Sequence, residues 1–211
     1  MNPMPLLALA LAATLPLTGC KIIKTAPAGG ETSATTDEAR MAALVADSYV
    51  PKLIPHVAAA ATDVVPLRAA IAGGLDAAGA KLGLRGAGGG GPWNFAVKGA
   101  GVVVTSDRAS RAAKLGLDTD ADGVADVQVQ LGPVIKGTAL RDVAPFYVFT
   151  DFRDQIEFAK LARALNDAAG AAIVLPEGDL LGKTVAFEGA FAILSAKDAL
   201  LIVPTALTAL P

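Results

Sequence analysis

Four aspartates in the segment 118–126 are the sharpest chemical signal of the sequence: Asp118, Asp120, Asp122 and Asp126. Carboxylates at alternate positions followed by Gly123 resemble the first part of a calcium-binding loop, in which oxygen ligands alternate and a glycine makes the sharp turn. The twelfth position, which should supply a bidentate carboxylate, is Val129, and the flanking segments alternate as strands do. Asp-Gly between two such segments is also a strong hairpin signal. A calcium site and a polar hairpin turn are therefore alternative interpretations.

A second polar group follows farther along the chain. Arg141 and Asp142 could fix a polyol or an acidic ligand together with Asp151 and Gln155, because guanidinium and carboxylate groups make strong, charge-assisted hydrogen bonds. The alternative is an internal ion pair combined with helix capping. The carboxylates of Asp142, Asp151 and Glu157 also suggest a different hypothesis, an enzyme that hydrolyses envelope carbohydrate.

The sequence offers little support for nucleophilic catalysis or for nucleic-acid binding. His56 is the only histidine, and no G-x-S-x-G motif accompanies it. The chain has 18 Lys+Arg, 20 Asp+Glu and a formal charge of −2, whereas nucleic-acid binding requires a basic surface. A single cysteine excludes a disulfide framework and a multi-cysteine zinc site. We therefore expect a protein that is not an enzyme and does not bind nucleic acid.

The single cysteine, Cys20, directly follows an N-terminal apolar segment. Residues 6–17 are too few to span a bilayer and are typical of a signal peptide. The four residues that end in Gly19 and Cys20 are Leu-Thr-Gly-Cys, the bulky-small-small-Cys pattern of a bacterial lipobox. This pattern predicts cleavage before Cys20, lipidation of its thiol and acylation of the new amine with a chain such as palmitate. More than one buried acyl chain gives stable membrane anchoring.

The predicted mature chain, residues 20–211, is then held by its N-terminal lipid on the periplasmic side of the cell envelope. Lys21, rather than an aspartate, follows the lipidated cysteine. By analogy with lipoprotein sorting in Gram-negative bacteria, we expect the outer membrane rather than the inner one. Residues 20–36 are small and polar, and they predict a flexible tether.

Residues 37–83 show the apolar spacing of helices, interrupted at Pro51 and Pro55. We predict a helical hairpin or a kinked pair of helices for this segment. Residues 84–92 are rich in glycine and formally contain G-x-G-x-x-G. A dinucleotide-binding loop of that kind should follow a strand and open a helix, so we interpret the segment as a linker.

From residue 93 onward the apolar period becomes two, as expected of strands. Strands are expected at 94–105, 112–118, 124–132, 183–194 and 199–203, with a helix capped by Thr150 or Asp151 between the third and fourth. Alternation in the third strand places Val129 inward and Gln130 outward. Gly99 and Gly101 predict a sharp bend in the first strand.

This order of elements predicts an α+β fold with an OB-like antiparallel β-barrel over residues 93–211, preceded by the helical hairpin. The order is strand-strand-strand-helix-strand-strand, with the helix between the third and fourth strands, as in an OB-fold. A generic antiparallel sandwich with one helix is the alternative.

Several motifs support a family resemblance that covers essentially the whole mature chain. The most specific are GPVIKGTALRD at 132–142 and DFRDQIEFA at 151–159, and shorter motifs lie at 94–99, 110–112 and 187–191. Together they resemble an uncharacterised family of bacterial periplasmic lipoproteins, domain-of-unknown-function family 2291. Asp154 stands where that family usually has asparagine. Genes of this family often accompany those of sugar ABC-type transporters, so the resemblance implies an accessory role in solute uptake.

Three functional hypotheses follow. The first is a non-enzymatic, lipid-anchored accessory module of a sugar ABC-type uptake system, which contacts a transporter component or binds a sugar and needs no cofactor. The second is the carboxylate-dependent hydrolase described above. The third is a structural envelope lipoprotein that is stabilised by calcium.

Overall fold

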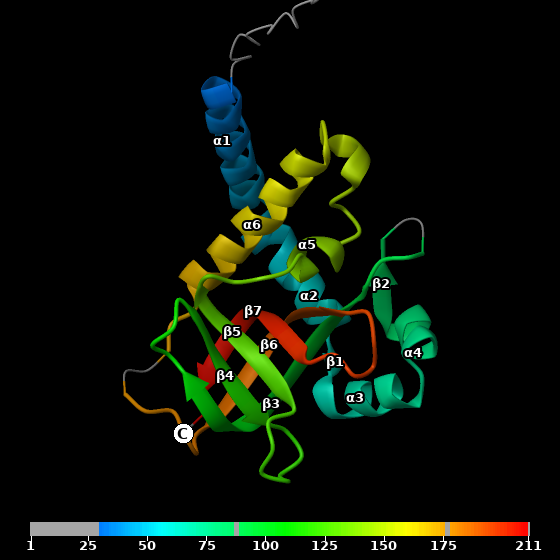
Figure 1. The fold of residues 1–211 in the computed structure, drawn as a ribbon, viewed down its shortest axis with the longest axis vertical. Coiled ribbons are helices and arrows are strands. Elements are labelled where there is room, and N and C mark those ends of the chain that lie inside the picture. The colour runs from blue at the N-terminus through cyan, green and yellow to red at the C-terminus, as the bar shows by residue number, and fades with distance from the viewer. Residues whose placement is uncertain (1–29, 87–88, 176–177, 211) are drawn as a thin grey trace, which may run out of the picture.

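A closed β-barrel with helices before and beside it makes up the computed structural model, which describes residues 30–86, 89–175 and 178–210 (Figure 1). Within these residues the five barrel strands are β3 (Trp93–Asp107), β4 (Ala112–Asp118), β5 (Val127–Pro133), β6 (Thr184–Ile193) and β7 (Leu200–Ala209). Their order is β3-β4-β5-β7-β6, and β6 pairs back with β3 to close the barrel. The pair β5–β7 is parallel, and helix α6 (Gln155–Ala172) connects β5 to β6. This arrangement confirms the predicted OB-like barrel.

The glycines of β3 allow its neighbours to approach closely. The first part of β3 pairs with β6, and its second part pairs with β4. A Cβ atom on Gly101 would overlap the backbone carbonyl of Asp118, and one on Gly99 would overlap the side chain of Val64. The absence of side chains at Gly99 and Gly101 therefore serves the packing of both β4 and the N-terminal helices against β3.

Helices account for most of the N-terminal segment. They are α1 (Gly30–Ser48), a π-helical turn (Tyr49–Leu53), α2 (Ile54–Ala60), α3 (Val64–Gly73) and α4 (Leu75–Leu82). Helix α1 begins at Gly30, so the predicted boundary of the tether at residue 36 is wrong for its last residues. The first turns of α1 carry no apolar periodicity because few of their side chains are apolar. The remaining tether residues, 20–29, lie outside the described residues.

Two very short strands attach the helices to the barrel. Strand β1 (Thr62–Asp63) pairs in parallel with β3, and β2 (Gly83–Arg85) pairs antiparallel with the start of β3. The predicted linker 84–92 therefore begins with a paired strand rather than with open loop. The sequence did not indicate this strand, because three residues are too few to show a pattern of period two.

Between β5 and β6 the chain forms α5 (Ala139–Asp142), a 3₁₀ turn (Phe149–Asp151) and then α6. The residue that caps α6 is Asp154, whose carboxylate accepts the N–H of Glu157 at 2.8 Å. The expected caps, Thr150 and Asp151, instead lie in the 3₁₀ turn. Asp154 stands three residues before Glu157, which is the spacing of a capping box. The helix therefore begins a few residues later than the sequence predicts.

Strand β7 continues through Pro204, where the sequence predicted an end at residue 203. The register of β6 and β7 shifts between Glu188 and Gly189, and Pro204 lies opposite Gly189. A proline donates no backbone N–H, so it is tolerated at such a bulge.

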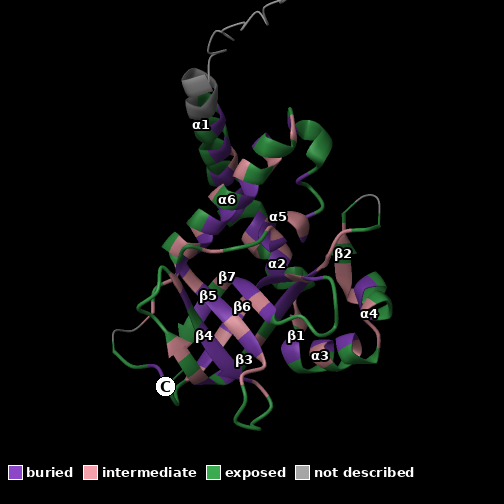
Figure 2. Ribbon diagram, in the orientation of Figure 1, coloured by how far each residue is buried: buried purple, intermediate pink, exposed green. Residues whose placement is uncertain are grey.

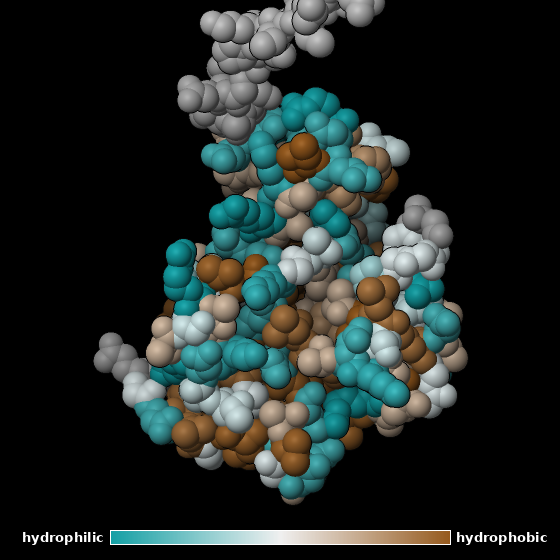
Figure 3. Space-filling model, in the orientation of Figure 1, coloured by the Kyte–Doolittle hydropathy of each residue, from teal (hydrophilic) through white to brown (hydrophobic). Residues whose placement is uncertain are grey.

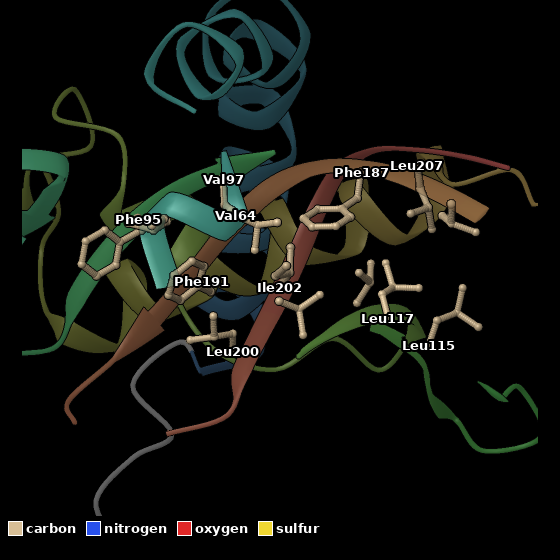
Figure 4. Close-up of a cluster of buried hydrophobic side chains, with 14 of the residues drawn as sticks. Val64, Phe95, Val97, Leu115, Leu117, Phe187, Phe191, Leu200, Ile202 and Leu207 are labelled. Carbon is tan, nitrogen blue, oxygen red and sulfur yellow. The ribbon is translucent and has the colours of Figure 1, made fainter. Parts of the chain in front are cut away.

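Two hydrophobic cores hold these elements together (Figure 2). The first fills the barrel and includes Phe95, Leu117, Phe191 and Ile202 (Figure 4). Helices α1, α2, α5 and α6 form the second core against the outer barrel wall, where Ala96, Ala190 and Val203 are small enough for close packing.

Candidate functional site

The aspartate loop begins at Asp118, which ends β4 and organises the turn through its carboxylate. Its oxygens accept backbone N–H groups from Asp120 at 3.1 Å, Ala121 at 2.7 Å and Gly123 at 2.7 Å. The bond from Gly123 is the main cause that holds the pKa of Asp118 below its usual value. Ala121 and Gly123 have φ angles of 67° and 83°, in the left-handed region that favours glycine. The turn is thus built around a charged carboxylate.

A cation from the helical segment faces this loop. Arg68 on α3 forms ion pairs with Asp126 and with Asp120, the latter at 3.1 Å. The side chain of Asp126 is 4% exposed, and it also accepts hydrogen bonds from the N–H and hydroxyl of Thr119 at 2.7 and 2.6 Å. A guanidinium that lies far away in the sequence therefore offsets part of the negative charge of the loop.

Three of the four predicted metal ligands come together. Carboxylate oxygens of Asp118, Asp120 and Asp126 lie within 4.8 Å of one another. Asp122 does not join this group, and its carboxylate accepts the N–H of Val124 at 2.7 Å. Hard carboxylate oxygens are the ligands that calcium prefers, although Arg68 pairs with two of these carboxylates and backbone N–H groups already bind the third.

A pocket of about 480 Å³ opens beside the aspartate loop, between α3 and the connection from β6 to β7. Ile71 and Leu200 supply apolar lining, and Ala196 adds a small side chain. The polar lining comes from one cation and three carboxylates: Arg68, Asp120, Asp126 and Asp198. Asp198 accepts the N–H groups of Leu194 and Ser195 at 2.8 and 2.9 Å. The pocket, called the Arg68 pocket below, combines hydrogen-bonding groups with an apolar lining.

The second predicted site has a different character. Arg141 and Asp142 form an ion pair through Nε at 2.7 Å and Nη2 at 3.1 Å. The same guanidinium donates to the carbonyl of Phe158 at 3.0 Å and lies 3.7 Å from the centre of its ring. Thr138 donates its hydroxyl to Asp142 at 2.6 Å. These contacts fix α5 against α6. The charges of Arg141 and Asp142 therefore have a structural role that requires no ligand.

Asp151 and Gln155, the other two residues of that predicted site, are exposed. The described hydrogen bonds and ion pairs do not join either side chain to Arg141 or Asp142. Glu157, the third carboxylate of the hydrolase hypothesis, is fully buried and ion-paired with Arg40. The three candidate carboxylates thus lie in three different surroundings: Asp142 is ion-paired with Arg141, Asp151 is exposed, and Glu157 is buried beside Arg40.

A polar cluster between α1 and α6 was not expected from the sequence. Asp37, 5% exposed, accepts hydrogen bonds from Arg153 at 2.9 Å and from Lys160 at 3.1 Å. The Arg153 bond is the larger cause that lowers the pKa of Asp37 to about 2. Arg40 adds its ion pair with Glu157 and a bond to the carbonyl of Asp151 at 3.2 Å. More than 110 residues separate the partners, so no local pattern could show these contacts.

His56 and the lipobox complete the list of sequence-derived candidates. His56 donates Nε2–H to the carbonyl of Val143 at 3.0 Å, and its ring lies edge-on to Phe146. These contacts pack α2 against the segment after α5. Gly19 and Cys20 lie outside the described residues.

The barrel, its order of strands and its N-terminal helices define an OB-fold protein of the α+β class. A similar solved structure is the crystal structure of an OB-fold protein from Thermotoga maritima, with a TM-score of 0.58 and 18% sequence identity over 82% of this chain and 96% of the other. At that identity the likeness shows the fold alone.

Residues 10–208 match a family described as predicted periplasmic lipoprotein (DUF2291), and the chain belongs to this family. Comparison with curated proteins gives no match. The family assignment agrees with the resemblance drawn from the motifs, and the matched residues include the whole barrel. Among the described residues, no helix is long and apolar enough to cross a bilayer.

Proposed function

We propose that this periplasmic lipoprotein is a non-enzymatic accessory of a sugar ABC-type uptake system and that it binds a hydroxylated solute in the Arg68 pocket. Lipidation of Cys20 would anchor it, with the outer membrane as the expected location. The observation that carries the proposal is the lining of the pocket, where one guanidinium and three carboxylates surround apolar side chains.

The chemistry of a sugar matches this lining. Sugar hydroxyls donate to carboxylates and accept from a guanidinium, and hydrogen bonds to charged groups are about twice as strong as those between neutral groups. The less polar C–H face of a sugar ring can cover Val65, which also lines the pocket and is 43% exposed. With a volume of about 480 Å³, the pocket lies within the range typical of small-molecule sites.

A thermal-shift screen of the full chain against neutral monosaccharides and polyols tests the proposal. A ligand that binds only the folded state at 100 times its Kd stabilises by about 2.7 kcal/mol. In a protein of this size that corresponds to a rise in Tm of about 5–10 °C. Arg68→Met should abolish the rise. Arg85→Met is the matched control, because Arg85 pairs with Asp76 and stacks on Trp93 elsewhere on the surface. The proposal fails if no compound shifts Tm or if both variants respond as the wild type does.

Calcium stabilisation of the envelope domain is the second candidate function. The clustering of carboxylate oxygens from Asp118, Asp120 and Asp126 within 4.8 Å favours it. Calcium bound there would compete with Arg68 for two of these carboxylates. We therefore expect a calcium-dependent rise in Tm that Asp118→Asn removes and that Asp122→Asn, in the same loop but outside the cluster, leaves in place. Coincident melting curves in calcium and in chelator would exclude this candidate.

A further inference from the structure

Exposed apolar side chains gather in the segment that precedes α6. Phe146, Val148 and Phe149 are 38%, 45% and 46% exposed, and they stand within four consecutive residues. Phe146 and Phe149 are the two exposed aromatic residues of the described chain. Scattered single apolar residues on a surface are normal, whereas a concentration of large ones indicates an interaction site. Figure 3 shows apolar surface at this end of the molecule among hydrophilic side chains.

This segment, called the Phe149 loop below, is fixed in place rather than free. Backbone hydrogen bonds from Asp151 to Val148 at 3.0 Å and from Phe152 to Phe149 at 3.1 Å close its 3₁₀ turn. The ring of Phe149 packs on Phe158 of α6 at 5.6 Å. Because the apolar side chains are held exposed by ordered structure, they lose little conformational freedom when a partner covers them.

The Phe149 loop lies at the end of the molecule from which the chain leads to its anchor. Figure 1 shows α1 projecting from the barrel and the yellow-green segment before α6 beside it at the same end. Arg40 on α1 binds the carbonyl of Asp151 at 3.2 Å. Arg40 stands ten residues after Gly30, which places the contact about 15 Å along the helix from its start.

The length of chain before α1 lets the loop reach the membrane. Nine residues separate Cys20 from Gly30, and this stretch can span at most about 35 Å. That reach exceeds the distance of about 15 Å between the start of α1 and the level of the Phe149 loop. A lipid on Cys20 therefore permits contact between the loop and the bilayer surface.

We propose that the Phe149 loop inserts into the interfacial region of the membrane that holds the lipid anchor. Val148 and Phe149 enter the boundary between headgroups and acyl chains, as apolar residues of peripheral membrane proteins do. Arg40 and Arg153, whose side chains are 52% and 53% exposed, lie next to the loop and are ion-paired with Glu157 and Asp37. The second contact fixes the orientation of the barrel and places the Arg68 pocket away from the bilayer surface.

Site-directed fluorescence on the full, lipidated chain tests this insertion. The inference rests on lipid anchoring through Cys20, which blocks the single native thiol, so Phe149→Cys supplies one reactive site for an environment-sensitive dye. Val148→Cys is a second variant, in case loss of the Phe149 ring disturbs the fold. Val124→Cys is the matched control, because Val124 is 63% exposed and lies in the aspartate loop on the barrel. Each protein is reconstituted into phosphatidylcholine–phosphatidylglycerol vesicles that carry spin-labelled lipids.

We expect dyes at positions 148 and 149 to shift to the blue and to be quenched by the lipids several-fold more than the dye at position 124. Aqueous iodide should quench in the opposite order. Equal iodide quenching at all three positions would overturn the inference. Shielding from iodide without quenching by lipid would overturn it too, because it indicates a protein partner. Flotation with the vesicles reports anchoring separately, so a protein that floats but shows no lipid quenching refutes insertion alone.

Discussion

The two tyrosines of the chain offer a test of the helical core, because each loses the same atom when changed to phenylalanine. Tyr49 is buried, and its hydroxyl makes no hydrogen bond to any of the described residues. The hydroxyl of Tyr147 lies 2.7 Å from that of Ser48. Both rings belong to the core between α1, α2 and the barrel wall.

The expected magnitudes follow from these contacts. A buried polar group without a partner costs about 1–3 kcal/mol, whereas a satisfied hydrogen bond contributes about 0.5–1.5 kcal/mol net. Tyr49→Phe removes the cost, so the free energy of unfolding should stay unchanged or rise by up to about 1 kcal/mol. Tyr147→Phe removes the bond and should lower it by about 1 kcal/mol, or about 2–4 °C in Tm.

Urea unfolding followed by circular dichroism, at neutral pH and at pH 11, measures both effects. Burial raises the pKa of Tyr49 to about 12, whereas a tyrosine in the unfolded chain ionises near pH 10. The folded state therefore loses stability as the pH rises from 10 toward 12, because ionisation favours the unfolded chain. Tyr49→Phe should reduce this alkaline loss. If Tyr49→Phe destabilises the protein as much as Tyr147→Phe does, the assignment of an unpartnered hydroxyl is wrong.

Three further predictions concern the barrel, the α1–α6 cluster and the anchor. Gly189→Ala should destabilise by about 1–3 kcal/mol or more through overpacking, because its Cβ would overlap the backbone of β7, while Gly86→Ala, with open space around it, should change little in chemical denaturation. Acid should remove the stabilisation from Asp37, which Arg153 holds at a pKa of about 2: the contribution is present above about pH 4 and is lost as the pH falls toward 2. Asp37→Asn should flatten that part of a stability–pH curve. Cys20→Ser should release the protein from membranes in flotation assays.

Much of the barrel could be predicted because its strands carry local patterns. Strand β4 begins at Ala112 and ends at Asp118 as expected, and α6 lies between the third and fourth barrel strands. Gln130 is a local exception, since alternation predicts an outward side chain. It is 4% exposed and binds the backbone N–H and carbonyl of Lys136. A buried amide that satisfies a neighbouring loop cannot be distinguished from a solvated one by period alone.

The candidate sites were predictable only in part, since a motif names residues but not their partners. The aspartate loop was evident from spacing, and three of its four carboxylates converge. Its partner, Arg68, lies more than 50 residues earlier in the chain. Arg141 and Asp142 were evident as a charged pair, yet their contacts with Phe158 and Thr138 serve packing of α5 on α6.

The sequence by itself determined the class of fold and the family, and it predicted the lipid anchor at Cys20, because these depend on periodicity, element order and short contiguous motifs. Only the tertiary structure placed Arg68 against Asp120 and Asp126, Asp37 against Arg153, and the Phe149 loop beside α1. Each of these juxtapositions depends on how helices pack on the barrel. Packing joins residues 50 to more than 110 positions apart, and such distances leave no periodic trace in the chain.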